Sequence, residues 1–285
     1  MELNQHMNGT NKINNTTIIE PPKGIALRGL KELWHYRDLL YFFTWRDIKV
    51  RYKQTFVGIL WALFQPVFAM IIFTIFFGKF ARMYSDDIPY PIFVFTGLLL
   101  WQFFSGAVTN VSNSLVENRD IITKIYFPRM ILPISVVITK LIDFFIACIV
   151  LVGLMIYYGY APNLGGLLLL PILLLITFMA SLGMGLFLSA INVKYRDVRY
   201  VLPYFIQMMF FITPVIYPAS ISGVYSWFLA MNPLTGVIKA ARASLLGNFP
   251  INWTLLIISG VTCLLMLLIG VIYFKKTDKY FADII

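Results

Sequence analysis

The stretch FFTWRDIKVRYKQTFVGILWALFQPVFAMIIFTIFFG, residues 42–78, sets the fold class of this chain of 285 residues. Five charged residues lie between Trp45 and Lys53, and none follows from Gln54 to Gly78, a run of 25 residues. About 20 apolar residues are enough for an α-helix to cross the hydrocarbon core of a bilayer. The backbone of such a segment must form its hydrogen bonds internally, because lipid offers none. The stretch therefore predicts a basic helix that leads directly into a transmembrane helix.

The same absence of charge recurs along the rest of the chain. Apolar residues make up 59 % of the sequence and charged residues only 13 %, against about a quarter in a soluble domain. A large soluble core is the alternative, but it requires amphipathic helices with charged outer faces, which the sequence lacks. The chain is therefore predicted to be an all-α polytopic membrane protein. The further charge-free runs cover residues 88–116, 144–193, 200–238 and 243–274.

Helix-breaking residues divide these runs into spans. The run 144–193 is too long for one crossing, and YYGYAPNLGG at 157–166 divides it. Pro214, Pro218 and Pro233 interrupt the run 200–238, which predicts one span and then an extracytoplasmic re-entrant hairpin at about 219–247; a seventh span is the competing interpretation. We expect six transmembrane helices within residues 56–274, at about 56–80, 91–116, 132–158, 166–192, 200–218 and 252–274.

Lysine and arginine determine the expected orientation. With six spans and the N-terminus inside, the inner segments are 1–55, 117–131, 193–199 and 275–285, which carry 18 of the 23 basic residues. Cytoplasmic loops carry the excess of Lys and Arg, so both termini are expected in the cytoplasm. Residues 1–25 are predicted to be a disordered cytoplasmic tail, and 275–285 a second tail. The net charge of +10 then reflects topology, and no nucleic-acid-binding module is visible.

Residues 26–55 are predicted to form an amphipathic helix in the inner head-group layer. Tyr41, Trp45, Ile48 and Tyr52 recur at helical spacing, and basic residues fill the other faces. A plain anchor with a positive flank is one interpretation. The other is a cationic collar where an anionic lipid head group meets a transport pathway, built from Trp45, Arg46, Lys49, Arg51 and Lys53.

The sequence lacks the motifs of an enzyme. It has no G-x-x-x-x-G-K-[ST] motif, no paired-carboxylate site and no Ser/His/Asp set. Its histidines are His6 and His35, so no metal-ligand spacing exists, and Cys148 and Cys263 lie in apolar runs as packing residues. We expect no catalytic site, metal or cofactor in this chain.

Lys140 and Asp143 are the ionisable residues within the expected spans. They lie at i, i+3 on one helix face and are expected to pair. Charged residues inside a membrane span usually serve a function, which is one interpretation of this pair. The alternative is that the pair is structural and its side chains snorkel to the membrane interface.

Two inner loops favour docking of a partner. VENRDIITKIYFPRMILP at 116–133 mixes charges with large apolar residues, and NVKYRDVRY at 192–200 is short and highly charged. A connecting turn needs neither aromatic residues nor a helical phase. A short helix that lies along the membrane needs both if it offers Ile121, Ile125, Tyr126 and Phe127 to a partner. The candidate docking residues are Glu117, Arg119, Asp120, Ile121, Lys124, Tyr126, Arg196 and Asp197.

Aromatic residues make up 16 % of the chain. Belts at the membrane interface and lipid-facing bulk account for most of them. Aromatic faces also stack on sugar rings, which suits a polymer that must slide. The candidate lining residues of such a path are Trp61, Phe64, Trp101, Phe104, Phe210, Phe211 and Tyr217.

Several blocks in order resemble the membrane subunit of bacterial ABC exporters of the second type, the polysaccharide-export permeases. Gly58, Trp61 and Pro66 match the family's first span, and an Arg-Asp pair matches residues 196–197. The resemblance covers most of residues 27–285, and the tail 1–25 has no clear counterpart. The other matching blocks are residues 39–67, 96–133, Thr213 with Pro214, and Asn232 with Pro233.

The resemblance implies a homodimer in the bacterial inner membrane with two ATP-binding-cassette subunits, which hold ATP and Mg²⁺. The 117–131 loop would couple to the ATPase, and a lipid-linked polysaccharide such as O-antigen would be exported. Alternatives are an exporter of teichoic acid, a drug or a small lipid, a membrane-embedded transferase and a proton-coupled flippase. The transferase needs a catalytic residue for which Asp143 is a poor candidate, and the flippase needs more titratable groups within the spans.

Overall fold

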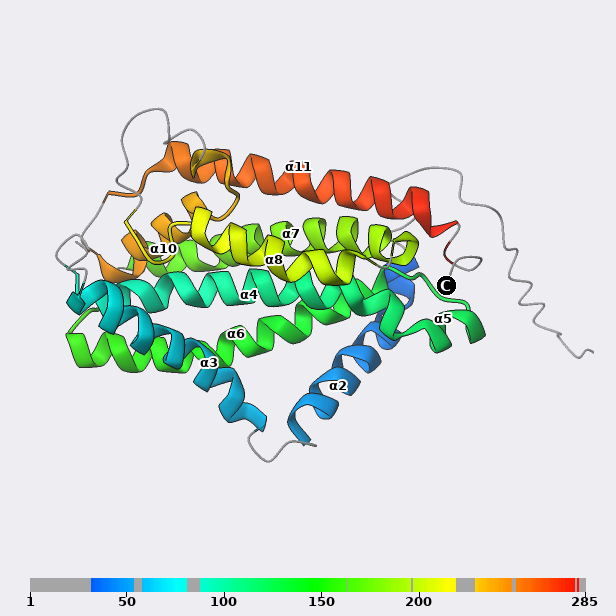
Figure 1. Ribbon diagram of the computed structural model, residues 1–285, viewed down its shortest axis with the longest axis horizontal. Helices are drawn as coiled ribbons and strands as arrows, with labels where there is room; N and C mark the ends of the chain where they lie inside the picture. Colours follow the sequence, from blue (N-terminus) through cyan, green and yellow to red (C-terminus); the bar gives the residue numbers. More distant parts are fainter. Residues whose placement is uncertain are drawn as a thin grey trace, which may run out of the picture.

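The computed structural model describes residues 32–53, 58–80, 88–162, 164–195, 197–218, 229–247, 250–279 and 281. Within these ranges every regular element is a helix, which confirms the all-α prediction (Figure 1). The predicted tail 1–25, residues 219–228 of the predicted hairpin and residues 282–285 lie outside the described residues.

Five described helices are long and apolar enough to cross a membrane. The first is α3 (Gly58–Phe73), which contains Pro66 and continues as the π-helix η1 (Thr74–Phe80). The other four lie side by side along the long axis of the molecule (Figure 1). They are α4 (Tyr90–Glu117), α6 (Ile131–Tyr158), α7 (Leu164–Lys194) and α11 (Trp253–Asp278).

Helix α4 lies at the centre of the bundle and packs against α6 and α7. Phe95 and Phe104 on this helix are fully buried. Helices α7 and α11 approach each other through glycine, because a Cβ atom on Gly270 would lie 2.1 Å from the carbonyl oxygen of Gly183. Small residues at such contacts let membrane helices pack closely.

The predicted fifth span is shorter in the structure. Helix α8 (Val198–Ile212) has 15 residues, or about 22 Å, against a hydrocarbon core of about 30 Å. It ends because Pro214 disfavours the helical conformation in the residue before it. Thr213 is accordingly extended, with φ −80° and ψ 133°. The structure thus shows five helices of spanning length and a shorter sixth apolar helix among its described residues.

The two ends of the bundle differ. Helix α5 (Arg119–Lys124), the turn between α7 and α8 and the end of α11 gather at one end, here named the α5 end (Figure 1). Helix α10 (Thr235–Leu246) lies at the opposite end, the α10 end, and packs against α4, α7 and α11. Helix α2 (Arg37–Lys53) descends obliquely from the α5 end and forms a V with α3 (Figure 1).

Candidate functional site

Helix α2 packs on α6, and of the predicted apolar stripe Tyr52 takes part in this contact through Asp143. Phe43 and Thr44 of α2 are buried. Tyr41 and Trp45, which belong to the predicted apolar stripe, are 69 % and 46 % exposed and stack on each other with ring centroids 6.4 Å apart. Helix α2 therefore presents one face to the bundle and a second aromatic face outward.

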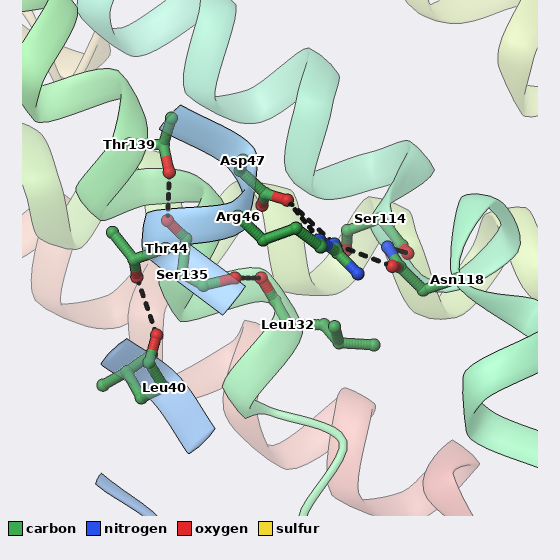
Figure 2. A network of polar contacts seen from close by, with 9 residues as sticks. All are labelled: Leu40, Thr44, Arg46, Asp47, Ser114, Asn118, Leu132, Ser135 and Thr139. Carbon is green, nitrogen blue, oxygen red and sulfur yellow. Dashed lines mark hydrogen bonds and ion pairs between the residues drawn. The ribbon is translucent and has the colours of Figure 1, made fainter. Parts of the chain in front are cut away.

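Arg46 ties α2 to the end of α4. Its Nε and Nη2 donate to one carboxylate oxygen of Asp47 at 2.9 and 2.8 Å, and Nη2 also donates to the side-chain oxygen of Asn118 at 2.9 Å. Asn118 in turn donates to the carbonyl of Ser114 at 2.8 Å. Figure 2 shows this chain of contacts running from α2 to the residue that separates α4 from α5.

Figure 2 also shows that hydroxyl groups of α2 and α6 bond within their own helices. Thr44 donates to the carbonyl of Leu40 at 2.9 Å. Ser135 donates to the carbonyl of Leu132 at 2.8 Å, and Thr139 to that of Ser135 at 2.9 Å. Among the side chains drawn in Figure 2, the one that bonds from α2 to another helix segment is therefore Arg46, through Asn118.

Asp143 on α6 receives donors from two helices. Arg51 and Tyr52 of α2 each donate to its carboxylate, and Lys140 of α6 contacts it at 3.3 Å. The predicted pair of Lys140 and Asp143 is confirmed. Burial and the bond to Asp143 raise the pKa of the Tyr52 phenol above its ordinary value, so the hydroxyl remains a donor.

The predicted cationic collar divides into two groups. Arg46 and Arg51 are half-buried and face α4 and α6, whereas Lys49 and Lys53 are exposed. The ammonium of Lys49 lies 5.3 Å from the centroid of the Trp45 ring, within the range of a cation–π contact. The outward face of α2 therefore carries two lysines beside an exposed tryptophan.

Helix α5 and residues 125–127 form a platform at the α5 end, in which some side chains are exposed and others are buried against the bundle. Ile122 and Phe127 are buried, and the Phe127 ring lies 5.6 Å from that of Phe43 on α2. Ile125 and Tyr126 between them are 62 % and 80 % exposed. Among the predicted docking residues, Ile121 is half-buried, and the exposed ones are Glu117, Arg119, Asp120, Lys124 and Tyr126.

The second predicted docking loop lies at the same end of the bundle (Figure 1). Asp197 is exposed, as are Tyr195 and Tyr200 on either side of it, while Arg196 lies outside the described residues. Asn192 anchors the loop, because its buried side chain donates to the carbonyl of Ser112 at 2.8 Å. The structure thus brings the two predicted docking segments to one end.

The aromatic residues predicted to line a path differ in their exposure. Trp101 and Phe104 of α4 are buried in the core. The half-buried Phe210 of α8 contacts Trp101 and Phe73, with ring centroids 5.5 and 5.6 Å apart. Tyr217 is also half-buried, and its hydroxyl donates to the carbonyl of Ile212 at 2.9 Å. The exposed members of the set are Trp61, Phe64 and Phe211.

Sequence reasoning did not single out Arg242, whose role the structure reveals. The side chain is 6 % exposed. It donates to the carbonyls of Phe93, Pro214 and Val215 at 3.1, 3.0 and 2.6 Å, and its guanidinium lies 3.6 Å from the centroid of the Phe93 ring. The break at Pro214 frees carbonyls from helical bonding, and Arg242 satisfies them. A single arginine inside an apolar helix was the available signal.

Comparisons with known proteins agree on one family. Residues 38–246 match the family model described as ABC-2 type transporter. The chain is 34 % identical over 221 residues to the O-antigen export system permease protein RfbA of Myxococcus xanthus, which covers 76 % of this chain and 84 % of that protein. It is 32 % identical over 264 residues to a protein of the same name from Klebsiella pneumoniae, covering 92 % and 100 %. The polysialic acid transport protein KpsM of Escherichia coli is 24 % identical over 239 residues, covering 82 % and 91 %.

Proposed function

On the premise that this chain belongs to the ABC-2 type transporter family, we propose that it is the permease subunit of an ATP-driven exporter of a lipid-linked polysaccharide. The cargo is O-antigen-like and moves from the cytoplasm to the periplasm through a channel formed by two copies. The observation that carries the cargo class is the similarity, along almost the whole chain, to permeases named for O-antigen export.

The energy comes from a separate subunit. The sequence has no Walker motif, and the α5 end offers an exposed platform with Ile125 and Tyr126 outward. Two copies of an ATP-binding-cassette subunit dock there and hold ATP and Mg²⁺. The exposed side chains of Tyr195, Asp197 and Tyr200 extend the docking surface. This permease then performs no catalysis of its own.

The α5 end faces the cytoplasm of a bacterium. Helix α5, the turn that leads into α8 and the end of α11, which belong to predicted inner segments, gather at this end (Figure 1), and the predicted inner segments together carry 18 of the 23 basic residues. Helix α8 and the turn that follows it make the sixth crossing. Helix α10 belongs to a re-entrant hairpin on the periplasmic side. The chain is accordingly a multi-pass protein of the inner membrane with both termini inside.

The cargo meets the outward face of α2 first. Lys49 and Lys53 supply exposed positive charge beside Trp45, which suits an anionic head group at the membrane surface. The glycan then follows the exposed aromatic side chains of α3 and α8. Trp61, Phe64 and Phe211 offer ring faces there, and a second copy of the chain closes the path.

The experiment combines partner identification with export. The tagged chain is purified from native membranes, and its partners are identified by mass spectrometry. In parallel, the chromosomal gene is deleted and surface polysaccharide is measured. A stoichiometric subunit with a Walker motif, together with lipid-linked polymer that accumulates in the cytoplasm of the deletion strain, supports the proposal. Normal surface polysaccharide in the deletion strain would contradict the proposed cargo. Absence of an ATPase among the purified partners would contradict the ATP-driven mechanism.

A further inference from the structure

Arg129, in the turn between α5 and α6, contacts the C-terminal end of α11. Its Nη1 atom donates to the backbone carbonyl and to the carboxylate of Asp278, with 3.0 Å between Nη1 and Oδ1. The two residues lie 149 positions apart in the sequence. The side chain of Arg129 is only 19 % exposed, and a guanidinium bound to a carboxylate makes a strong, charge-assisted contact. This contact therefore joins the segment after α5 to α11.

Phe281 adds an apolar contact at the same place. Its side chain is fully buried, and its ring lies 5.4 Å from that of Phe274. The guanidinium carbon of Arg129 lies 5.8 Å from the centroid of the Phe281 ring, within the range of a cation–π contact. Phe281 packs on the protein beyond the apolar part of α11, from which four charged residues separate it: Lys275, Lys276, Asp278 and Lys279.

The cluster that buries Phe281 also contains the buried side chains of the platform, Ile122 and Phe127. Helix α5 has six residues, and a helix of this length is not stable unless it packs on other parts of the protein. The exposed Ile125 and Tyr126 lie between the two buried residues. Their position therefore depends on how this cluster packs.

We propose that Arg129, Asp278 and Phe281, here named the C-terminal contact, hold the platform in the position that binds the ATP-binding-cassette subunit. A surface that is already held in its bound conformation avoids the entropy cost of ordering it on association. The end of α11 thus acts in partner binding through the platform. This inference rests on the proposed function only for the identity of the partner.

Cysteine labelling of the purified full chain tests whether the C-terminal contact holds α5. Ile122→Cys is introduced into a chain in which Cys148 and Cys263 are replaced by alanine, and its reaction with a maleimide is followed. We expect Phe281→Ala to raise the labelling rate about tenfold, because α5 then opens locally. Phe281→Leu keeps a large apolar side chain and should restore the slow rate. Leu246→Ala, which truncates a buried side chain at the α10 end, is the matched control and leaves the rate unchanged.

The ion pair gives an independent test. Arg129→Gln and Asp278→Asn each break the same contact, so each should raise the labelling rate of Ile122→Cys. We expect an increase of about threefold for Arg129→Gln, and no further increase in the double variant, because the two side chains act as one pair. Additive effects of the two changes would contradict the pairing.

Recovery of the ATPase tests whether the position of the platform matters for docking. Phe281→Ala changes none of the exposed side chains of the platform, yet we expect the ATPase recovered in a pull-down to fall about fivefold. Leu246→Ala also removes a buried apolar side chain and should lower the melting temperature, but it should retain the ATPase. This difference separates a positioning role from a general loss of stability.

Two outcomes overturn the inference: unchanged labelling in Phe281→Ala, or full recovery of the ATPase despite fast labelling. The double variant Ile125→Ser with Tyr126→Ser distinguishes its failure from that of the proposed function. If the double variant loses the ATPase while Phe281→Ala retains it, the role of the C-terminal contact alone is wrong. If both retain it, docking of the ATPase at this platform is wrong, and the inference fails with it.

Discussion

The side-chain amide of Asn232 donates a hydrogen bond of 2.8 Å to the hydroxyl oxygen of Thr213, which lies 19 residues earlier in the sequence. Both side chains are buried. Each precedes a proline, and the Asn232 side-chain oxygen also accepts from the backbone N–H of Leu234 at 3.0 Å. Two separate chain breaks, at Pro214 and Pro233, are thus joined by one polar contact.

Loss of this contact should destabilise the protein. Thr213→Val removes the acceptor and leaves the Asn232 amide buried, and we expect a loss of about 1 kcal/mol of stability, the usual worth of an interhelical bond in a membrane. Asn232→Leu should cost more, because Leu234 loses its acceptor as well. Thermal unfolding of the purified single and double variants measures the coupling. Strictly additive losses would show that the two side chains do not support each other.

Arg242 should be more important still for stability. Arg242→Met leaves the carbonyls of Phe93, Pro214 and Val215 without this donor, and removal of one partner from a buried charged contact costs about 3 kcal/mol or more. Arg242→Lys should restore only part of the lost stability, since an ammonium cannot reproduce the forked N–H donors of a guanidinium group. Folded yield and melting temperature are the measurements. Lys239→Met, half-buried on the same helix, is the control, and an equal effect of the two methionine variants would contradict the prediction.

The exposed platform at the α5 end should bind the ATPase. A double change of Ile125→Ser and Tyr126→Ser removes two exposed apolar side chains without touching the core. We expect ATPase recovered in a pull-down to fall about tenfold, since central apolar anchors carry most of an interface's energy, with normal insertion. Ile156→Ser with Tyr157→Ser, 77 % and 80 % exposed in α6, is the matched control. Unchanged co-purification would place the docking surface elsewhere.

The basic residues of α2 should separate into two functional classes. Lys49→Gln with Lys53→Gln removes exposed charge and should reduce export while expression and melting temperature stay unchanged. Arg46→Gln breaks the contacts to Asp47 and Asn118 and should lower stability as well. Surface polysaccharide and membrane protein levels are measured together. A parallel fall of export and expression in the lysine variant would favour a simple membrane anchor.

The contact of α7 with α11 is so close that adding one methyl group there should destabilise the protein. A Cβ atom on Gly270 would lie 2.1 Å from the backbone oxygen of Gly183, whereas a Cβ atom on Gly260 would meet nothing nearer than 3.9 Å. Gly270→Ala should therefore destabilise by about 1–3 kcal/mol through overpacking. Gly260→Ala on the same helix should be neutral or stabilising by up to about 1 kcal/mol. Equal melting temperatures for the two variants would contradict the packing.

Local features of the sequence predicted a large part of this molecule. Long charge-free runs specify membrane helices, because apolar residues enter the hydrocarbon core favourably whereas each charged residue there costs free energy. The pairing of Lys140 with Asp143 follows from spacing alone, since residues three apart share a helix face. The end of α8 follows from Pro214, which restricts the residue before it.

Contacts between distant segments escaped such reasoning. Arg51 reaches Asp143, and Arg242 reaches the carbonyls freed at Pro214, across many residues of chain. No periodicity of a single helix encodes these partners. Sequence reasoning named the basic residues of α2 as candidates, but it did not separate those that contact the bundle, Arg46 and Arg51, from the exposed lysines.

The sequence alone determined that this chain is an all-α membrane protein with a basic helix ahead of its first span. Only the tertiary structure decided which apolar faces are core, placing Trp101 and Phe104 inside while Trp61 and Phe64 stay exposed. The physical reason is the solvent. In water, polarity marks the outer face of a helix, whereas in lipid both faces are apolar, so the packing of neighbouring helices decides which one is buried.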